Sequence, residues 1–145
     1  MSRAAAREQA LKLLFQWDIR NEEPQRVLEE YRAYAGEEEF YTALSETDET
    51  FMEEILSGVW DNLEEIDRLI AQNTKDWKIS RLSKVLVAIL RIAAYEMKYR
   101  EDIPLLVSIN EAVELAKNYD ATETASAFVN GILGGVFKEL DPGSD

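Results

Sequence analysis

The sequence has 145 residues, 46% of them hydrophobic, and a formal net charge of −13. Its length and hydrophobic content suit one folded domain, or two small halves that share a core, and exclude a disordered chain. The chain has no cysteine and no histidine, which excludes disulfides, thiolate chemistry and the usual neutral-pH general base.

The charge is unevenly distributed, and no segment is typical of a signal peptide or a membrane span. Residues 71–100 hold seven basic residues against two acidic ones, and residues 1–20 hold four against two. Residues 21–70 and 101–145 are strongly acidic, so two basic islands stand in an acidic chain. The longest apolar run, residues 85–94, is interrupted by Arg91 and is too short to cross a bilayer. We therefore expect a soluble, cytoplasmic protein that has no membrane partner.

The first half of the chain is predicted to be helical. Apolar residues recur at helical spacing from residue 4 to residue 19, and Asn21 and Pro24 mark the end of this helix. Residues 25–35 are typical of a short helix, and the stretch "GEEEF" at 36–40 is expected to open another. One long helix is predicted for residues 45–74, with this buried stripe: Phe51, Ile55, Leu56, Val59, Leu63, Ile66 and Ile70.

The second half continues with helices. From residue 85 to residue 97 only Arg91 and Glu96 are charged, which predicts a helix enclosed on most sides. The stretch "SINEAVELAKNY" follows, and Ser108 with Glu111 three residues later forms a capping-box pattern.

The last apolar segment contains an Asn-Gly pair, which is a strong hairpin signal in other contexts. Here the apolar spacing is i, i+3, i+4, i+7, i+8, i+11, i+12 and it passes through Asn130 and Gly131 without a break. This periodicity favours a helix. Glycines at 131, 134 and 135 then serve either close helix packing or a surface that a ligand approaches.

No catalytic constellation is present, because the chain lacks a nucleophile elbow, a P-loop and a GxGxxG motif. Adjacent carboxylates such as Glu53 and Glu54 point about 100° apart on a helix and do not converge. We therefore predict a protein that is not an enzyme and has neither a cofactor nor a metal site.

Binding of single-stranded RNA fits the pattern better, since it needs cations for phosphates and a flat ring for a base. Arg3 and Arg7 lie one turn apart, with Lys12 in the same basic island. The second island has cations at steps of three around Trp77, namely Lys75, Lys78, Arg81 and Lys84. Phe128 is a candidate ring. The competing interpretation is that the cations only solubilise the surface and that Phe128 belongs to the core.

Four stretches, "AREQALKLLFQWD", "RLSKVLVAILRIAAYE", "IPLLVSINEAVELAKNY" and "FVNGILGG", together resemble the NusB family of transcription antitermination factors. They occur in order from the N-terminus to about residue 140. The resemblance implies an all-α fold of about seven helices in two packed subbundles, which we place at about 1–72 and 73–140 of a single domain. It also implies binding of the boxA element of nascent ribosomal RNA together with NusE, a small-subunit ribosomal protein, in an antitermination complex of RNA polymerase.

The resemblance also assigns residues. Arg3 and Arg7 would contact phosphates or bases, Phe128 would lie at the RNA face, Asn130 and Gly131 would shape that face, and Thr124 would lie in the neighbouring loop. Glu111 and Asn110 would be a helix cap and its neighbour. Because only two arginines stand at the N-terminus and the overall charge is acidic, we predict that tight RNA binding depends on NusE.

Two other functions remain open from the sequence. The chain could be a detached RNA-binding domain of a ribosomal RNA methyltransferase, since the same helical fold occurs there. It could also be a helical adaptor that binds only protein, with its glycine-lined last helix forming a homodimer seam.

Overall fold

The computed structural model describes residues 3–74, 82–120 and 122–141. These residues form seven helices and no strand, which confirms the all-α prediction. The helices fall into two compact units that meet in sequence at Asp61 and Asn62. Among the described residues, no helix combines the length and the apolar character that crossing a membrane requires.

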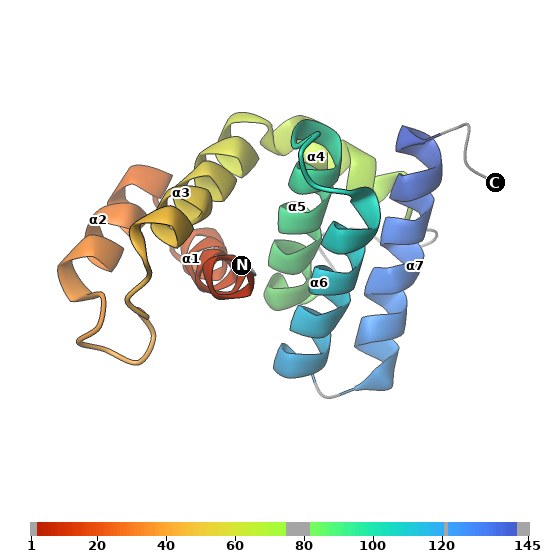
Figure 1. Ribbon diagram of the computed structural model, residues 1–145. Coiled ribbons are helices and arrows are strands. Elements are labelled where there is room, and N and C mark those ends of the chain that lie inside the picture. Colours follow the sequence, from red (N-terminus) through yellow and green to blue (C-terminus); the bar gives the residue numbers. More distant parts are fainter. Residues whose placement is uncertain (1–2, 75–81, 121, 142–145) are drawn as a thin grey trace. The chain divides into compact units, whose positions relative to one another are not determined.

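The first unit consists of α1 (Ala4–Arg20), α2 (Pro24–Tyr34) and α3 (Glu46–Asp61), which pack against one another (Figure 1). α1 ends as predicted, because Asn21 adopts a left-handed conformation with φ 54° and its N–H bonds the carbonyl of Trp17. Pro24 then opens α2, where its fixed φ suits the first helical turn.

The stretch "GEEEF" is not helical, and the prediction of a helix there is wrong. Residues 35–45 form a loop in which the N–H of Gly36, at φ 84°, bonds the carbonyl of Tyr41 at 2.8 Å. The Gln9 amide of α1 fastens this loop by donating to the carbonyl of Phe40 (3.1 Å) and accepting from the N–H of Thr42 (2.9 Å). These bonds to α1 satisfy backbone groups that a helix would otherwise pair internally.

The long helix predicted for residues 45–74 is two helices, α3 and α4 (Leu63–Ala71). Asn62 leaves the helical region at φ −123°, ψ 23°, and its carbonyl accepts from the N–H of Ile66, which starts α4. The residues of the expected stripe therefore serve two cores, with Phe51 to Val59 in the first unit and Ile66 and Ile70 in the second. Accordingly, the division between the units lies one helix earlier than the expected boundary near residue 72.

The second unit consists of α4, α5 (Lys84–Tyr99), α6 (Leu105–Tyr119) and α7 (Glu123–Leu140). α5, α6 and α7 run side by side and α4 packs on α5 and α7 (Figure 1). Every residue of α5 from Leu86 to Met97 is buried, as the sequence predicts. Its two charges are paired: Arg91 donates twice to Asp67 at 2.9 Å, and Glu96 accepts from the Ser108 hydroxyl at 3.0 Å.

The bond between Glu96 and Ser108 overturns the predicted capping box. α6 begins at Leu105, directly after Pro104, so Ser108 lies inside the helix and is only 2% exposed. Its hydroxyl satisfies the buried Glu96 carboxylate, and Glu111, expected as a cap, is a helix-interior residue.

α7 continues through Asn130 and Gly131, which confirms the helix over the hairpin. A Cβ on Gly135 would collide with the side chain of Asn73, so close packing explains this glycine. Nothing lies within 4 Å of a Cβ placed on Gly131 or Gly134, so close packing among the described residues does not explain these two.

Candidate functional site

The N-terminal arginines gather over one aromatic ring in the first unit. The guanidinium carbons of Arg3 and Arg7 lie 4.3 Å and 5.3 Å from the ring centroid of Phe51, within the range of a cation–π interaction. The two arginines differ in exposure, since Arg3 is half-buried and Arg7 is only 4% exposed. Arg3 therefore offers surface to a ligand, whereas Arg7 offers almost none.

Lys12 lies on another face of α1. Nine residues separate it from Arg3, which corresponds to about half a turn around the helix axis. Its ammonium nitrogen is 5.9 Å from the ring centroid of Phe40 in the loop after α2. The structure therefore groups Lys12 with this loop and does not bring it beside the two arginines.

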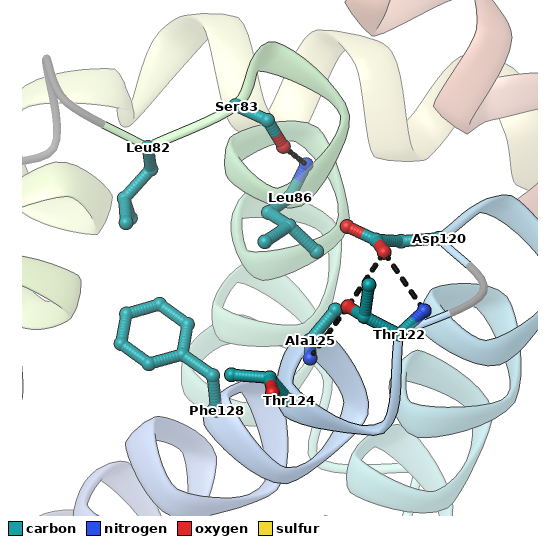
Figure 2. Close-up of a pocket in the computed structure, with 8 residues that line it drawn as sticks. All are labelled: Leu82, Ser83, Leu86, Asp120, Thr122, Thr124, Ala125 and Phe128. Carbon is teal, nitrogen blue, oxygen red and sulfur yellow. Dashed lines mark hydrogen bonds between the residues drawn. The ribbon is translucent and has the colours of Figure 1, made fainter.

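The second unit contains a pocket of about 250 Å³ where α5 and α7 begin (Figure 2). Leu82 and Phe128 lie on one side, Asp120 on the other and Leu86 between them. The remaining lining residues are Ser83, Thr122, Thr124 and Ala125. Of the residues predicted for RNA binding, Thr124 and Phe128 meet here, with Thr124 exposed and Phe128 half-buried.

Both helix N-termini at this pocket are capped by hydroxyl side chains. Ser83 accepts from the N–H of Leu86 at 3.2 Å, and Thr122 accepts from the N–H of Ala125 at 3.3 Å. Asp120 in turn accepts from Thr122, from its hydroxyl at 2.7 Å and its N–H at 3.1 Å. The hydroxyl and then the N–H of Thr122 lower the pKa of the Asp120 carboxyl, so it is ionised at neutral pH. The pocket is therefore an apolar cleft with a fixed acceptor at one edge, which suits a flat ring bearing N–H donors.

Lys84 is the first residue of α5, directly after Ser83, and its side chain is exposed. The other cations of its island, Lys75, Lys78 and Arg81, lie outside the described residues, as does Trp77. Lys84 is not one of the lining residues, but it follows the lining residue Ser83 directly in the chain.

Asn130 is exposed, but it is two residues from Phe128 on α7. A separation of two residues is about 200° around a helix, so the two side chains point to opposite sides. The structure does not bring Asn130 to the pocket, and it leaves Asn130 beside the open position of Gly131.

Four further residues belong to these sites, although the sequence does not predict them there: Ser83, Asp120, Thr122 and Phe51. Ser83 and Thr122 carry a signal that could have been used, since each is a hydroxyl residue directly before an apolar-periodic helix. Phe51 has no local signal, because its contact with the arginines depends on the packing of α1 against α3.

The first unit has a groove of about 320 Å³ between α1 and the loop after α2. Ile19 and Phe40 are 56% and 37% exposed there, so two large apolar side chains of the groove are open to a partner. Glu38 lines the groove, and Glu37 and Glu39 beside it are exposed. The groove is therefore an apolar surface with an acidic rim. The full lining is Phe15, Gln16, Ile19, Arg20, Glu38, Phe40 and Tyr41.

Comparison with known proteins gives consistent matches over nearly the whole chain. The sequence model of the NusB family matches residues 4–138. The chain is 48% identical over 142 residues to the transcription antitermination protein NusB of Acetivibrio thermocellus, and the match covers 95% of this chain and 90% of that protein. Among solved structures, NusB of T. maritima is similar with a TM-score of 0.81 and 36% identity, over 96% of this chain and 92% of that one. A structure of antitermination factors NusB and NusE in complex with dsRNA is similar with a TM-score of 0.77 and 26% identity, over 96% of this chain and 99% of that one.

Proposed function

The chain belongs to the NusB family of transcription antitermination proteins, which is not a family of enzymes, and from that premise we propose that it binds boxA-type single-stranded RNA together with NusE. The observation that carries the proposal is the half-buried ring of Phe128 in a pocket at the start of α7. Its neighbours in the α7 stripe, Val129 and Ile132, are buried, whereas part of the Phe128 ring is open to a ligand in the pocket. Single-stranded RNA is recognised by rings of this kind, on which unpaired bases stack.

Each pocket residue has a role in this proposal. One base inserts between Phe128 and Leu82, the Thr124 hydroxyl and the Asp120 carboxylate meet its polar edge, and the Lys84 ammonium neutralises a neighbouring phosphate. A carboxylate only accepts hydrogen bonds, so Asp120 favours a base edge that carries N–H donors.

On the first unit, Arg3 contacts the RNA directly, and the buried Arg7 contributes from below the surface. Lys12 and Asn130 add weaker contacts outside these two clusters, since neither lies beside the pocket or the arginine pair.

NusE occupies the groove of the first unit. Ribosomal proteins are basic, and the groove combines exposed apolar side chains with the acidic rim at residues 37–39. Charge complementarity of this kind raises association rates and suppresses wrong partners. The protein acts in the cytoplasm, within the antitermination complex of RNA polymerase.

A titration of labelled boxA RNA with the protein and NusE tests the RNA contacts. Arg3→Glu and Lys84→Glu should each weaken binding and lower the salt dependence by roughly one unit of slope or more. Lys117→Glu is the matched control, because Lys117 is exposed on α6, pairs only loosely with Glu114 at 3.7 Å and belongs to neither cluster.

Equal effects of all three substitutions would mean that only overall charge matters and would refute the assigned contacts. If the protein binds NusE but binds no RNA in any condition, the chain is an adaptor that binds only protein. In that case the open face of α7 at Gly131 and Gly134 becomes the candidate for a homodimer seam.

A further inference from the structure

Two guanidinium groups, those of Arg3 and Arg7, lie over the ring of Phe51. Core packing alone does not require this arrangement. Phe51 lies in the first half of α3 and is 3% exposed, and the guanidinium carbons of Arg3 and Arg7 both lie within 6 Å of its centroid. A leucine or isoleucine could fill an apolar site between α1 and α3, but only an aromatic ring attracts a cation through its π-face.

The position of Arg3 at the start of α1 is electrostatically unfavourable, so its contact with the Phe51 ring matters for holding it in place. Arg3 immediately precedes the helix, where the positive end of the helix dipole disfavours a cation. Arg7 lies one turn further on and brings a second like charge. Two unfavourable electrostatic contributions therefore meet at Arg3, and the contact with the Phe51 ring contributes a favourable one.

A guanidinium held over a ring is also a better ligand for RNA than a free one. Arginine is planar and presents its N–H donors in a fixed fork, so a restrained arginine loses less conformational entropy when it binds a phosphate or stacks on a base. The half-buried Arg3 keeps part of its surface available, whereas Arg7 is enclosed.

We propose that Phe51 is a positioning residue for RNA binding: its ring holds the Arg3 guanidinium in the orientation that contacts RNA, and Arg7 completes the support from the buried side. This inference rests on the proposed contact between Arg3 and RNA. It predicts that the planar shape of Arg3 matters, and not only its charge.

The test is a double-mutant cycle measured by fluorescence anisotropy with labelled boxA RNA and NusE. Phe51→Leu should weaken binding by roughly three- to tenfold, the range expected for losing the restraint on one flexible side chain. It should leave the salt dependence unchanged, because no charge is removed. In an Arg3→Ala background the same substitution should have little further effect, since the residue through which Phe51 acts is gone.

Met52→Leu is the matched control, because Met52 is the next residue on α3, is fully buried and is replaced at nearly constant volume. It should leave RNA affinity unchanged. Equal losses from Phe51→Leu in the wild-type and Arg3→Ala backgrounds would show a purely structural role and overturn the inference.

Arg3→Lys keeps the core intact and serves if Phe51→Leu does not fold. It should reproduce most of the affinity loss of Arg3→Ala while keeping the wild-type salt slope, because lysine retains the charge but not the planar fork. Affinity equal to wild type for Arg3→Lys would overturn the inference. If wild-type protein binds RNA and Arg3→Ala does not change the affinity, both the Arg3 contact and the role of Phe51 are refuted. The proposed RNA binding is not refuted by that result. If wild-type protein does not bind RNA, the proposed function fails.

Discussion

Replacing Phe128 with alanine should separate a binding role of this ring from a packing role. Base stacking on an aromatic side chain contributes about 1–3 kcal/mol per base by alanine substitution, so RNA affinity should fall by roughly 5- to 150-fold. The salt dependence should stay constant, because no charge changes. The stability cost should stay below the roughly 3–5 kcal/mol typical of a fully buried phenylalanine, since Phe128 is half-buried at the pocket.

Phe137→Ala is the control for this prediction. Phe137 is also a half-buried phenylalanine of α7, but it does not line the pocket. Both variants are titrated against labelled boxA RNA with NusE, and their thermal unfolding is followed by circular dichroism. Equal losses of RNA affinity in the two variants, in proportion to their losses of stability, would refute the assignment of Phe128 to the RNA-binding pocket.

Three further predictions concern stability. Gly131→Ala should stabilise the protein by about 0.5–1 kcal/mol, because the site is open, whereas Gly135→Ala should destabilise it through the collision beside α7; urea unfolding of both variants measures the difference. Asp67→Asn should cost about 1.5–3 kcal/mol, because it removes the charge from the partly buried pair with Arg91, and an unchanged urea midpoint would contradict this. Partial burial raises the pKa of Glu30. Hydrogen bonds from Tyr41, Arg20 and Gln16 together outweigh that effect, so the pKa is lowered overall. Its contribution to stability is therefore present above the unfolded value of 4.5 and lost as the pH falls through the folded pKa, so Glu30→Gln should reduce the acid sensitivity of the melting temperature.

Much of the fold could be predicted because helical periodicity is a local property. The apolar spacing through Asn130 and Gly131 identified α7 as a helix, and the near absence of charge identified the enclosed α5. The break at Asn62 could not be found in this way. The apolar stripe of residues 45–74 keeps its phase across the break, while its two halves pack into different units.

The errors at Ser108 and at "GEEEF" have a common cause. In both cases a local pattern is sufficient for a cap or a helix, but hydrogen bonds to residues far away in the sequence determine the structure instead. Ser108 bonds Glu96 of α5, and the 36–40 segment is held by Gln9 of α1. The burial of Arg7 over Phe51 is of the same kind, because it follows from the packing of α1 on α3. The RNA contacts of Arg3, Lys84, Thr124 and Phe128 stay predictions.

Titration of labelled boxA RNA with this protein, with and without NusE and at two salt concentrations, tests whether the protein and NusE bind RNA jointly. Binding by the protein alone should be weak and salt-sensitive, because its net charge of −13 opposes RNA binding. Binding should be markedly tighter once NusE is present. Tight binding by the protein alone at physiological salt, or an RNA affinity that NusE does not change, would contradict joint binding.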